Sequence, residues 1–122
     1  MPQLLAALAD LYGPTGCEDR VRRFLLDQLK GLGDVRTDGA GNVVLFRKGA
    51  DSARRLLVTA HMDQPGLRVT GTDEDGCLAA VPVGPLHRAL LDGAAAVFAD
   101  GTAGICRVAA DGRIAVDCGG AP

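Results

Sequence analysis

The sequence predicts an α/β protein in which two helices pack on a mixed sheet and part of a small antiparallel β-rich module follows. Three observations predict this class: apolar residues recur at helical spacing near the start, a continuous apolar run lies mid-chain, and short strands between Asp-Gly turns fill the rest. Hydrophobic residues make up 48% of the 122 residues, which is enough for a core. We expect a first part at residues 1–84 and a second part at residues 85–122.

The first two elements are predicted to be helices. Residues 2–12 carry leucines on one helical face, and a Gly-Pro pair ends this helix because proline cannot continue it. Thr15 and Glu18 then form a T-x-x-E pattern, which is typical of a capping box at a helix start. We expect the second helix to begin there and to end near Gly31 or Gly33.

Strands are predicted wherever short apolar or alternating runs lie between turn signals. Glycine-containing turns join most of them, as in β-hairpins, and we interpret Asp38 and Asn42 as turn-forming residues. The run at 56–60, Leu-Leu-Val-Thr-Ala, has almost no polar position, so we expect it to be a buried strand. The full set of expected strands covers residues 35–38, 42–46, 56–60, 67–70, 77–81, 94–98, 104–108 and 113–116.

Composition excludes several classes of function. Thirteen basic against fifteen acidic residues, with one Tyr and three Phe, leave little basis for nucleic-acid binding. Without an apolar stretch of about 20 residues or a basic amino-terminal region, we expect no membrane contact, no signal peptide and a cytoplasmic location. The scattered cysteines match no metal-binding spacing, so we interpret them as small, reduced core residues: Cys17, Cys77, Cys106 and Cys118.

The strongest candidate site follows the run at 56–60. His61 and Asp63 form an H-x-D pair, which suits a metal ligand because one imidazole nitrogen binds the ion while an acceptor on the other sets the tautomer. The alternative is a buried, hydrogen-bonded histidine at a strand end. A dinuclear site needs about five ligands and a catalytic zinc about three, so His61 by itself does not complete either.

We interpret the other candidate site residues as structural. His87 is expected in a solvent-facing connector, and the Asp-Glu-Asp-Gly run at 73–76 in a solvated turn rather than a calcium site. A nucleophilic mechanism lacks support, since neither Ser52 nor Cys17 has a suitable histidine base nearby in sequence.

Three pieces of sequence in order resemble one family. Gly13–Glu18 (G-P-T-G-C-E), Asp38–Asn42 (D-G-A-G-N) and Ala60–Gly66 (A-H-M-D-Q-P-G) are similar to the opening of the TET-type dinuclear metalloaminopeptidases, metallopeptidase family 42, which include glutamyl and deblocking aminopeptidases and cellulase-M-like proteins. The resemblance spans nearly all of this chain but about the first third of a family member. It implies a partial zinc-peptidase-like α/β sandwich at 1–84 and part of an inserted β-rich domain at 85–122.

The resemblance also implies roles for particular residues. His61 would be a metal ligand for one of two divalent ions (Zn, Co or Mn), and Asp63 the catalytic-site carboxylate that orients it. The other family ligands and the glutamate general base lie beyond the inserted domain, outside these residues. Gln64 and Pro65 replace a glutamate and an aliphatic residue of the family, which removes one acidic charge and stiffens the turn.

The leading hypothesis is therefore the amino-terminal portion of a metal-dependent aminopeptidase-like hydrolase that cleaves amino-terminal residues from peptides. Because its active site is incomplete, we expect the chain alone to be inactive, with the remaining ligands supplied in a homo-oligomer or by a companion chain. One alternative is a non-catalytic binding or self-association module derived from such a peptidase. Another is one half of a split enzyme.

Overall fold

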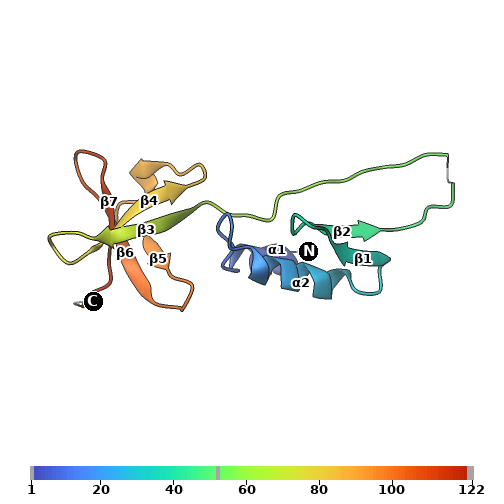
Figure 1. The fold of residues 1–122 in the computed structure, drawn as a ribbon, viewed down its shortest axis with the longest axis horizontal. Helices are drawn as coiled ribbons and strands as arrows, with labels where there is room; N and C mark the ends of the chain where they lie inside the picture. Colours follow the sequence, from blue (N-terminus) through green and yellow to red (C-terminus); the bar gives the residue numbers. More distant parts are fainter. Residues whose placement is uncertain (1, 52, 121–122) are drawn as a thin grey trace. The chain divides into compact units, whose positions relative to one another are not determined.

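The computed structural model describes residues 2–51 and 53–120 of the chain (Figure 1). Within these residues the chain forms two compact units, divided between Asp63 and Gln64. None of the described helices is long and apolar enough to cross a membrane. The elements are, in order, α1 (Pro2–Ala9), α2 (Asp19–Leu29), β1 (Asp34–Thr37), β2 (Val43–Phe46), β3 (Gly66–Thr72), β4 (Leu78–Val83), the 3-10 turn η1 (Arg88–Leu90), β5 (Ala95–Val97), β6 (Ala103–Val108) and β7 (Ile114–Asp117).

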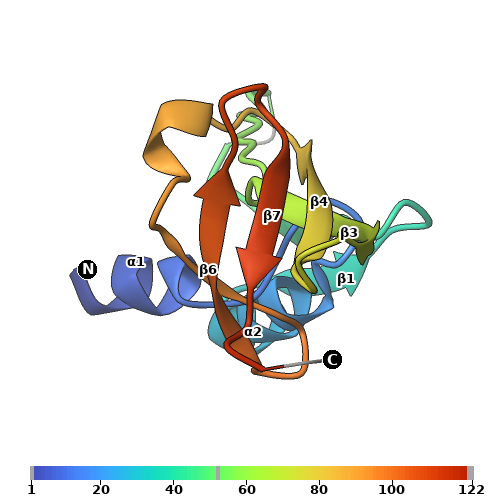
Figure 2. The ribbon, with the colours of Figure 1, turned by 90° about the vertical axis from the view of Figure 1, so that its left-hand side faces the viewer.

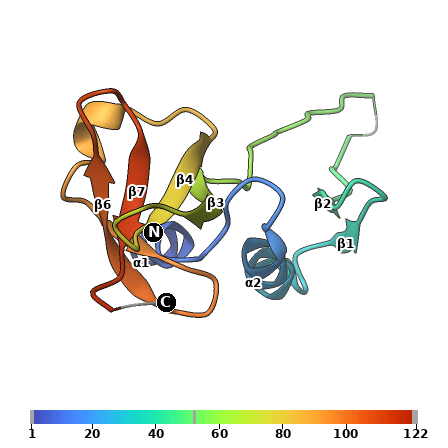
Figure 3. The ribbon, with the colours of Figure 1, turned by 60° about the vertical axis from the view of Figure 1, so that its left-hand side comes forward.

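The first unit is built on α2, which packs against the antiparallel hairpin of β1 and β2. Figure 3 shows α2 nearly end on, with the two strands beyond it. Val21 of α2 is the buried side chain, with 3% of its surface exposed. The loop before α2 passes close to Val21, since a Cβ added at Gly13 would lie 2.6 Å from Val21 Cγ2. Glycine at position 13 therefore allows this loop to pack on the helix.

The predicted capping box at the start of α2 is wrong. The helix begins at Asp19, its N-cap is Glu18, and the Glu18 side chain makes no capping hydrogen bond. The Glu18 carboxylate instead accepts a hydrogen bond from the backbone N–H of Gly16, at 2.6 Å. The Thr15 hydroxyl donates to Asp63, far along the chain, so a tertiary contact has replaced the local one that the pattern indicated.

The prediction of a buried strand at 56–60 is also wrong for this structure. Residues 54–60 are neither helix nor strand, and they belong to a long open stretch between β2 and β3 (Figure 1). Leu56, Leu57 and Val58 are 90%, 85% and 81% exposed. A strand needs a hydrogen-bonded neighbour, and no strand within residues 2–51 and 53–120 pairs with this segment. The paired strands described are all antiparallel, and the mixed sheet stays a prediction for the whole protein.

The second unit is a five-stranded antiparallel sheet with the strand order β3-β4-β7-β6-β5. Figure 2 shows β6, β7 and β4 running side by side. Alternate residues of β6 and β7 point into its core, as a strand period of two requires. The approach of these strands is close: a Cβ at Gly104 would lie 2.6 Å from Val116 Cγ1. The buried hydrophobic residues of this unit are Ala80, Cys106, Ile114 and Val116.

The second unit begins earlier than the predicted boundary after residue 84. The pairing of β4 with β7 joins the hairpin at 66–83 to the later strands, so both belong to one sheet. The division into catalytic and inserted parts at 84 concerns the whole protein and stays a prediction.

The Asp-containing turns form as predicted. Asp73 Oδ1 accepts hydrogen bonds from the N–H groups of Asp75 and Cys77, at 3.0 and 2.8 Å. Asp100 and Asp111 close the β5–β6 and β6–β7 turns by accepting from the N–H groups two residues on, at 2.8 and 3.0 Å. These hydrogen bonds favour the ionised carboxylates and hold the pKa of Asp100 and of Asp111 below the ordinary value.

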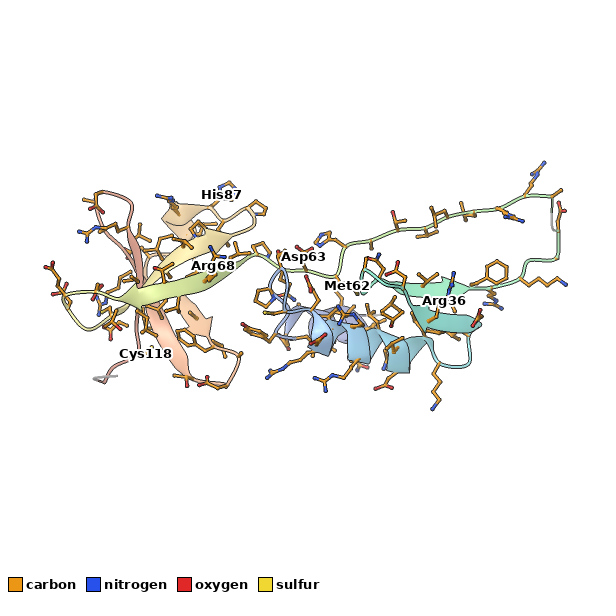
Figure 4. The ribbon with its side chains drawn as sticks, viewed as in Figure 1. Arg36, Met62, Asp63, Arg68, His87 and Cys118 are labelled. Atoms are coloured by element: carbon orange, nitrogen blue, oxygen red, sulfur yellow. The ribbon has the colours of Figure 1, made fainter. Side chains whose placement is uncertain are left out.

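The cysteines divide by environment. Cys106 is a core residue, as predicted, and burial raises the pKa of its thiol. Cys17 and Cys118 are exposed, so the core interpretation is wrong for these two. Their positions explain this: Cys17 lies in the loop before α2, and Cys118 follows the last residue of β7 (Figure 4).

Candidate functional site

The candidate site lies in the first unit, beside a cleft of about 400 Å³. Three segments line it: the α2 face from Glu18 to Leu29, the turn between β1 and β2, and residues 60–63. Figure 4 labels Met62 and Asp63 at the end of the open stretch. The cleft therefore contains both predicted site residues, His61 and Asp63, although no strand carries them.

His61 and Asp63 contact each other as the sequence predicts. Nδ1 of His61 lies 2.9 Å from the backbone carbonyl oxygen of Asp63 and 3.2 Å from its Oδ1. Both partners accept hydrogen bonds, so the proton of a neutral ring resides on Nδ1. Nε2 then carries the lone pair that a metal ion requires. The His61 side chain is 84% exposed, which rules out a buried histidine in this structure.

Thr15 completes the local arrangement. Its hydroxyl donates to Oδ2 of Asp63 at 2.7 Å, so the two carboxylate oxygens have different partners. This hydrogen bond is the largest cause of a lowered pKa for Asp63, with the charge and hydrogen bond of His61 adding to it and partial desolvation opposing it. The carboxylate is therefore ionised at neutral pH. Sequence reasoning missed Thr15 because its pattern also matches a helix cap.

The turn between β1 and β2 forms another wall of the cleft. Asp38 accepts from the N–H groups of Ala40 and Asn42 at 3.0 and 2.9 Å and from Asn42 Nδ2 at 2.9 Å, which confirms its turn-forming role. The Asn42 amide is the main cause of the lowered pKa of Asp38. Arg22 of α2 donates from Nε to the Gly41 carbonyl at 2.7 Å and also pairs with Asp19. The bond between Arg22 and Gly41 ties the turn to the helix.

The other candidates do not join this site. His87 is exposed and precedes η1 in the second unit, in the connector that the sequence predicted (Figure 4). The Asp73 carboxylate is engaged by its own turn. Cys17 is exposed, and Ser52 lies outside the described residues.

The side chains at this site can supply one ligand to a metal centre. His61 offers a suitably oriented nitrogen, while Asp63 is committed to His61 and Thr15. Among residues 2–51 and 53–120, no three His, Cys, Asp or Glu side chains are grouped to hold an ion. A complete centre therefore requires ligands from outside the described part of the chain.

Comparison with known proteins identifies the family. The chain belongs to the M42 glutamyl aminopeptidase family, whose sequence profile matches residues 41–110. This is a family of metal-dependent peptidases. The matched region includes the end of the hairpin turn at the cleft, the H-x-D pair and most of the second unit.

Individual relatives agree with this assignment. The chain is 39% identical over 84 residues to a lysyl aminopeptidase of Pyrococcus furiosus, covering 67% of this chain and 24% of that protein. It superposes on the aminopeptidase APDkam598 of Desulfurococcus kamchatkensis with a TM-score of 0.84 at 26% identity, covering 98% of this chain and 37% of the other. For the Pyrococcus horikoshii TET1 peptidase, which can assemble into a tetrahedron or a large octahedral shell, the TM-score is 0.76 at 26% identity, covering 96% and 40%.

The chain spans 31% and 24% of the length of two curated aminopeptidases that it matches. The solved relatives extend well beyond the aligned part in the same way, since 37% to 40% of each is covered. The family is thus established for this chain from about a third of a member, and that third includes the H-x-D pair.

Proposed function

We propose that this chain is the amino-terminal portion of a metal-dependent aminopeptidase that removes amino-terminal residues from peptides. In this proposal His61 is a ligand to one of two divalent ions and Asp63 orients it. The observation that carries the proposal is the Nδ1 contact of His61 with Asp63, at 2.9 and 3.2 Å, in a chain of the M42 family. Residues 1–84 are assigned to the catalytic domain and residues 85–122 to an inserted β-rich domain.

The contribution of this chain to catalysis is to present one nitrogen in a defined direction. Asp63 keeps the proton of His61 on Nδ1, and its negative charge makes the ring a stronger donor at Nε2. The ions, when bound, supply Lewis acidity and an activated water. The other ligands and the general base come from the rest of the protein or from a companion chain, in an oligomer such as the relatives form.

The test compares alanine variants of the two histidines, His61 and His87. Each variant is made in the native protein, which is purified together with any companion chain that supplies the rest of the active site. His61→Ala should lower peptidase activity by at least about 100-fold and reduce the bound metal, because loss of an orienting partner alone costs 10- to 100-fold. His87→Ala is the matched control, since it removes an exposed imidazole in the other unit. Activity and metal content should be unchanged in that variant.

Equal metal content and activity in the two variants would contradict the proposal. Cleavage only at internal peptide bonds, away from the amino terminus, would contradict the aminopeptidase assignment but not the metal site. Zinc, cobalt and manganese should each be tried, because site geometry rather than intrinsic affinity selects among them.

The exposed run at 56–58 bears on how the isolated chain behaves in solution. The run Leu56–Val58 is at least 81% exposed and consists of residues common in strands. An unpaired, apolar segment of this kind pairs readily with another chain. The partner that we infer for the isolated chain is a second copy of itself.

A further inference from the structure

Thr15 sits in a loop whose backbone is constrained on both sides. The N–H of Cys17 donates to the carbonyl of Pro14 at 2.8 Å, which closes a tight turn around Thr15. Gly16, at φ +87°, adopts the left-handed conformation that this turn needs, and its N–H is held by Glu18. On the other side, Gly13 packs against Val21. The hydroxyl is therefore carried on a defined backbone rather than on a free loop.

The Thr15 hydroxyl controls the orientation of the Asp63 carboxylate. A carboxylate rotates easily about its last side-chain bond, and a single histidine contact at 3.2 Å does little to stop it. The O–H···O contact from Thr15 is shorter, at 2.7 Å, and its acceptor is charged. With Oδ2 held, the carboxylate plane is set and Oδ1 faces the imidazole.

His61 depends on this arrangement because its ring has little packing of its own. Its side chain is 84% exposed, while that of Asp63 is 39% exposed. Its ring contacts with hydrogen-bonding groups are both at Asp63 within the described residues. The direction of Nε2 therefore follows from two groups of Asp63: its backbone carbonyl, and its carboxylate, which Thr15 holds.

We propose that Thr15 is a positioning residue that aims the His61 imidazole and maintains its Nδ1–H tautomer by holding Asp63. The inference rests on the proposed function, in which Nε2 of His61 binds a metal ion. It extends the H-x-D pair to a chain of three residues drawn from two segments 48 positions apart. It also gives the threonine of the G-P-T-G-C-E piece a role at the site.

The first measurement is the tautomer of His61 in the metal-free 122-residue chain, read from long-range ¹H–¹⁵N spectra at mildly alkaline pH, where histidine rings are neutral. The natural chain and Thr15→Ser should show the proton on Nδ1. Thr15→Val, which keeps the shape but lacks the hydroxyl, should show a measurable fraction of the Nε2–H tautomer, limited by the Asp63 backbone carbonyl, which still accepts from Nδ1. His87, in the same spectra, is the internal reference and should not change.

The second measurement is the affinity of the native protein for Zn²⁺. Thr15→Val should weaken the Zn²⁺ affinity about tenfold, the lower end of the range for lost orienting partners, and Thr15→Ser should restore it.

An Nε2–H tautomer in the natural chain would overturn the inference without any variant. So would equal tautomer populations in the natural chain and Thr15→Val. If Thr15→Val shifts the tautomer while His61→Ala retains full metal, the positioning role stands and the proposed metal ligand falls.

Discussion

At the scale of single residues, the proposed function depends on the protonation of the two ring nitrogens of His61. His61 Nδ1 has two acceptors from Asp63, and Asp63 has a donor from Thr15, so the proton positions follow from hydrogen-bond chemistry alone. His61 and Asp63 lie in a segment without regular structure, and Thr15 lies in a turn. Hydrogen bonds of these residues, rather than a strand, therefore hold the site in place.

Gly13 is the residue whose replacement tests how tightly the site loop is packed. The added methyl group of Gly13→Ala would lie 2.6 Å from Val21, which is 3% exposed and cannot move aside freely. We expect a loss of about 1 to 3 kcal/mol in the free energy of unfolding, the usual cost of overpacking. Urea unfolding followed by circular dichroism measures it.

Gly39→Ala is the control for Gly13→Ala. It adds the same methyl group in the same unit, with no atom within 4 Å of the new Cβ. Its unfolding midpoint should match or slightly exceed that of the natural chain, because alanine restricts the unfolded state more than glycine does. Equal destabilisation by both variants would show that the loop does not depend on this contact.

At the scale of elements, the stretch between β2 and β3 differs most from its prediction. Its apolar residues favour a strand, but pairing requires a neighbour that residues 2–51 and 53–120 do not provide. Helix α1 shows a similar effect, since Leu4 and Leu5 of its expected apolar face are 43% and 71% exposed. The apolar residues of both segments thus stay exposed in the part of the chain that the structure describes.

The exposed run predicts how the isolated chain behaves in concentrated solution. Leu57, 85% exposed, lies at the centre of the run, and a lysine there interrupts it. Leu57→Lys should raise the concentration needed for self-association about tenfold, which corresponds to losing the burial of one leucine. Sedimentation velocity over a range of concentrations measures this shift.

Leu90→Lys provides the comparison. Leu90 is 76% exposed but lies in η1, outside any strand-forming run. The same charge added there should leave self-association nearly unchanged. A similar shift in both variants would mean that net charge, rather than pairing of the 56–58 segment, controls association.

At the scale of the whole molecule, acid should destabilise the fold. Hydrogen bonds or ion pairs in both units lower the pKa of a set of carboxyl groups below the ordinary value of 3.8: Asp38, Asp63, Asp100, Asp111 and Asp117. The unfolded chain therefore takes up these protons at a higher pH than the folded chain. The stability that these groups contribute is complete above the ordinary value and is lost as pH falls through the lower folded-state values.

We expect the urea midpoint to be level near neutral pH and to decline from about pH 5 towards pH 2. Asp100→Asn is the matched variant, because an amide oxygen still accepts from the N–H of Thr102 but does not titrate. Its decline should be smaller than that of the natural chain. A midpoint that is independent of pH over this range would contradict the assignment of charged turn carboxylates.

Local patterns predict much of this molecule. Turn chemistry at Asp38, Asp73, Asp100 and Asp111 gave the hairpins, because an Asx side chain and a following glycine act within a few residues. The contact of His61 with Asp63 was predictable for the same reason, because it joins residues only two positions apart. Helix α2 followed from its apolar periodicity, with its start displaced by the wrong assignment of Thr15.

Contacts between segments far apart in the sequence determine the features that local patterns do not predict. Whether Thr15 caps a helix or holds a carboxylate depends on Asp63, 48 residues away, and no local pattern distinguishes the two. Whether residues 56–60 form a strand depends on a partner strand, since backbone pairing is never a property of one segment. The amino-acid order thus establishes the family, the turns and the contact between His61 and Asp63, while the third partner, Thr15, is added only when the loop before α2 meets that pair in space.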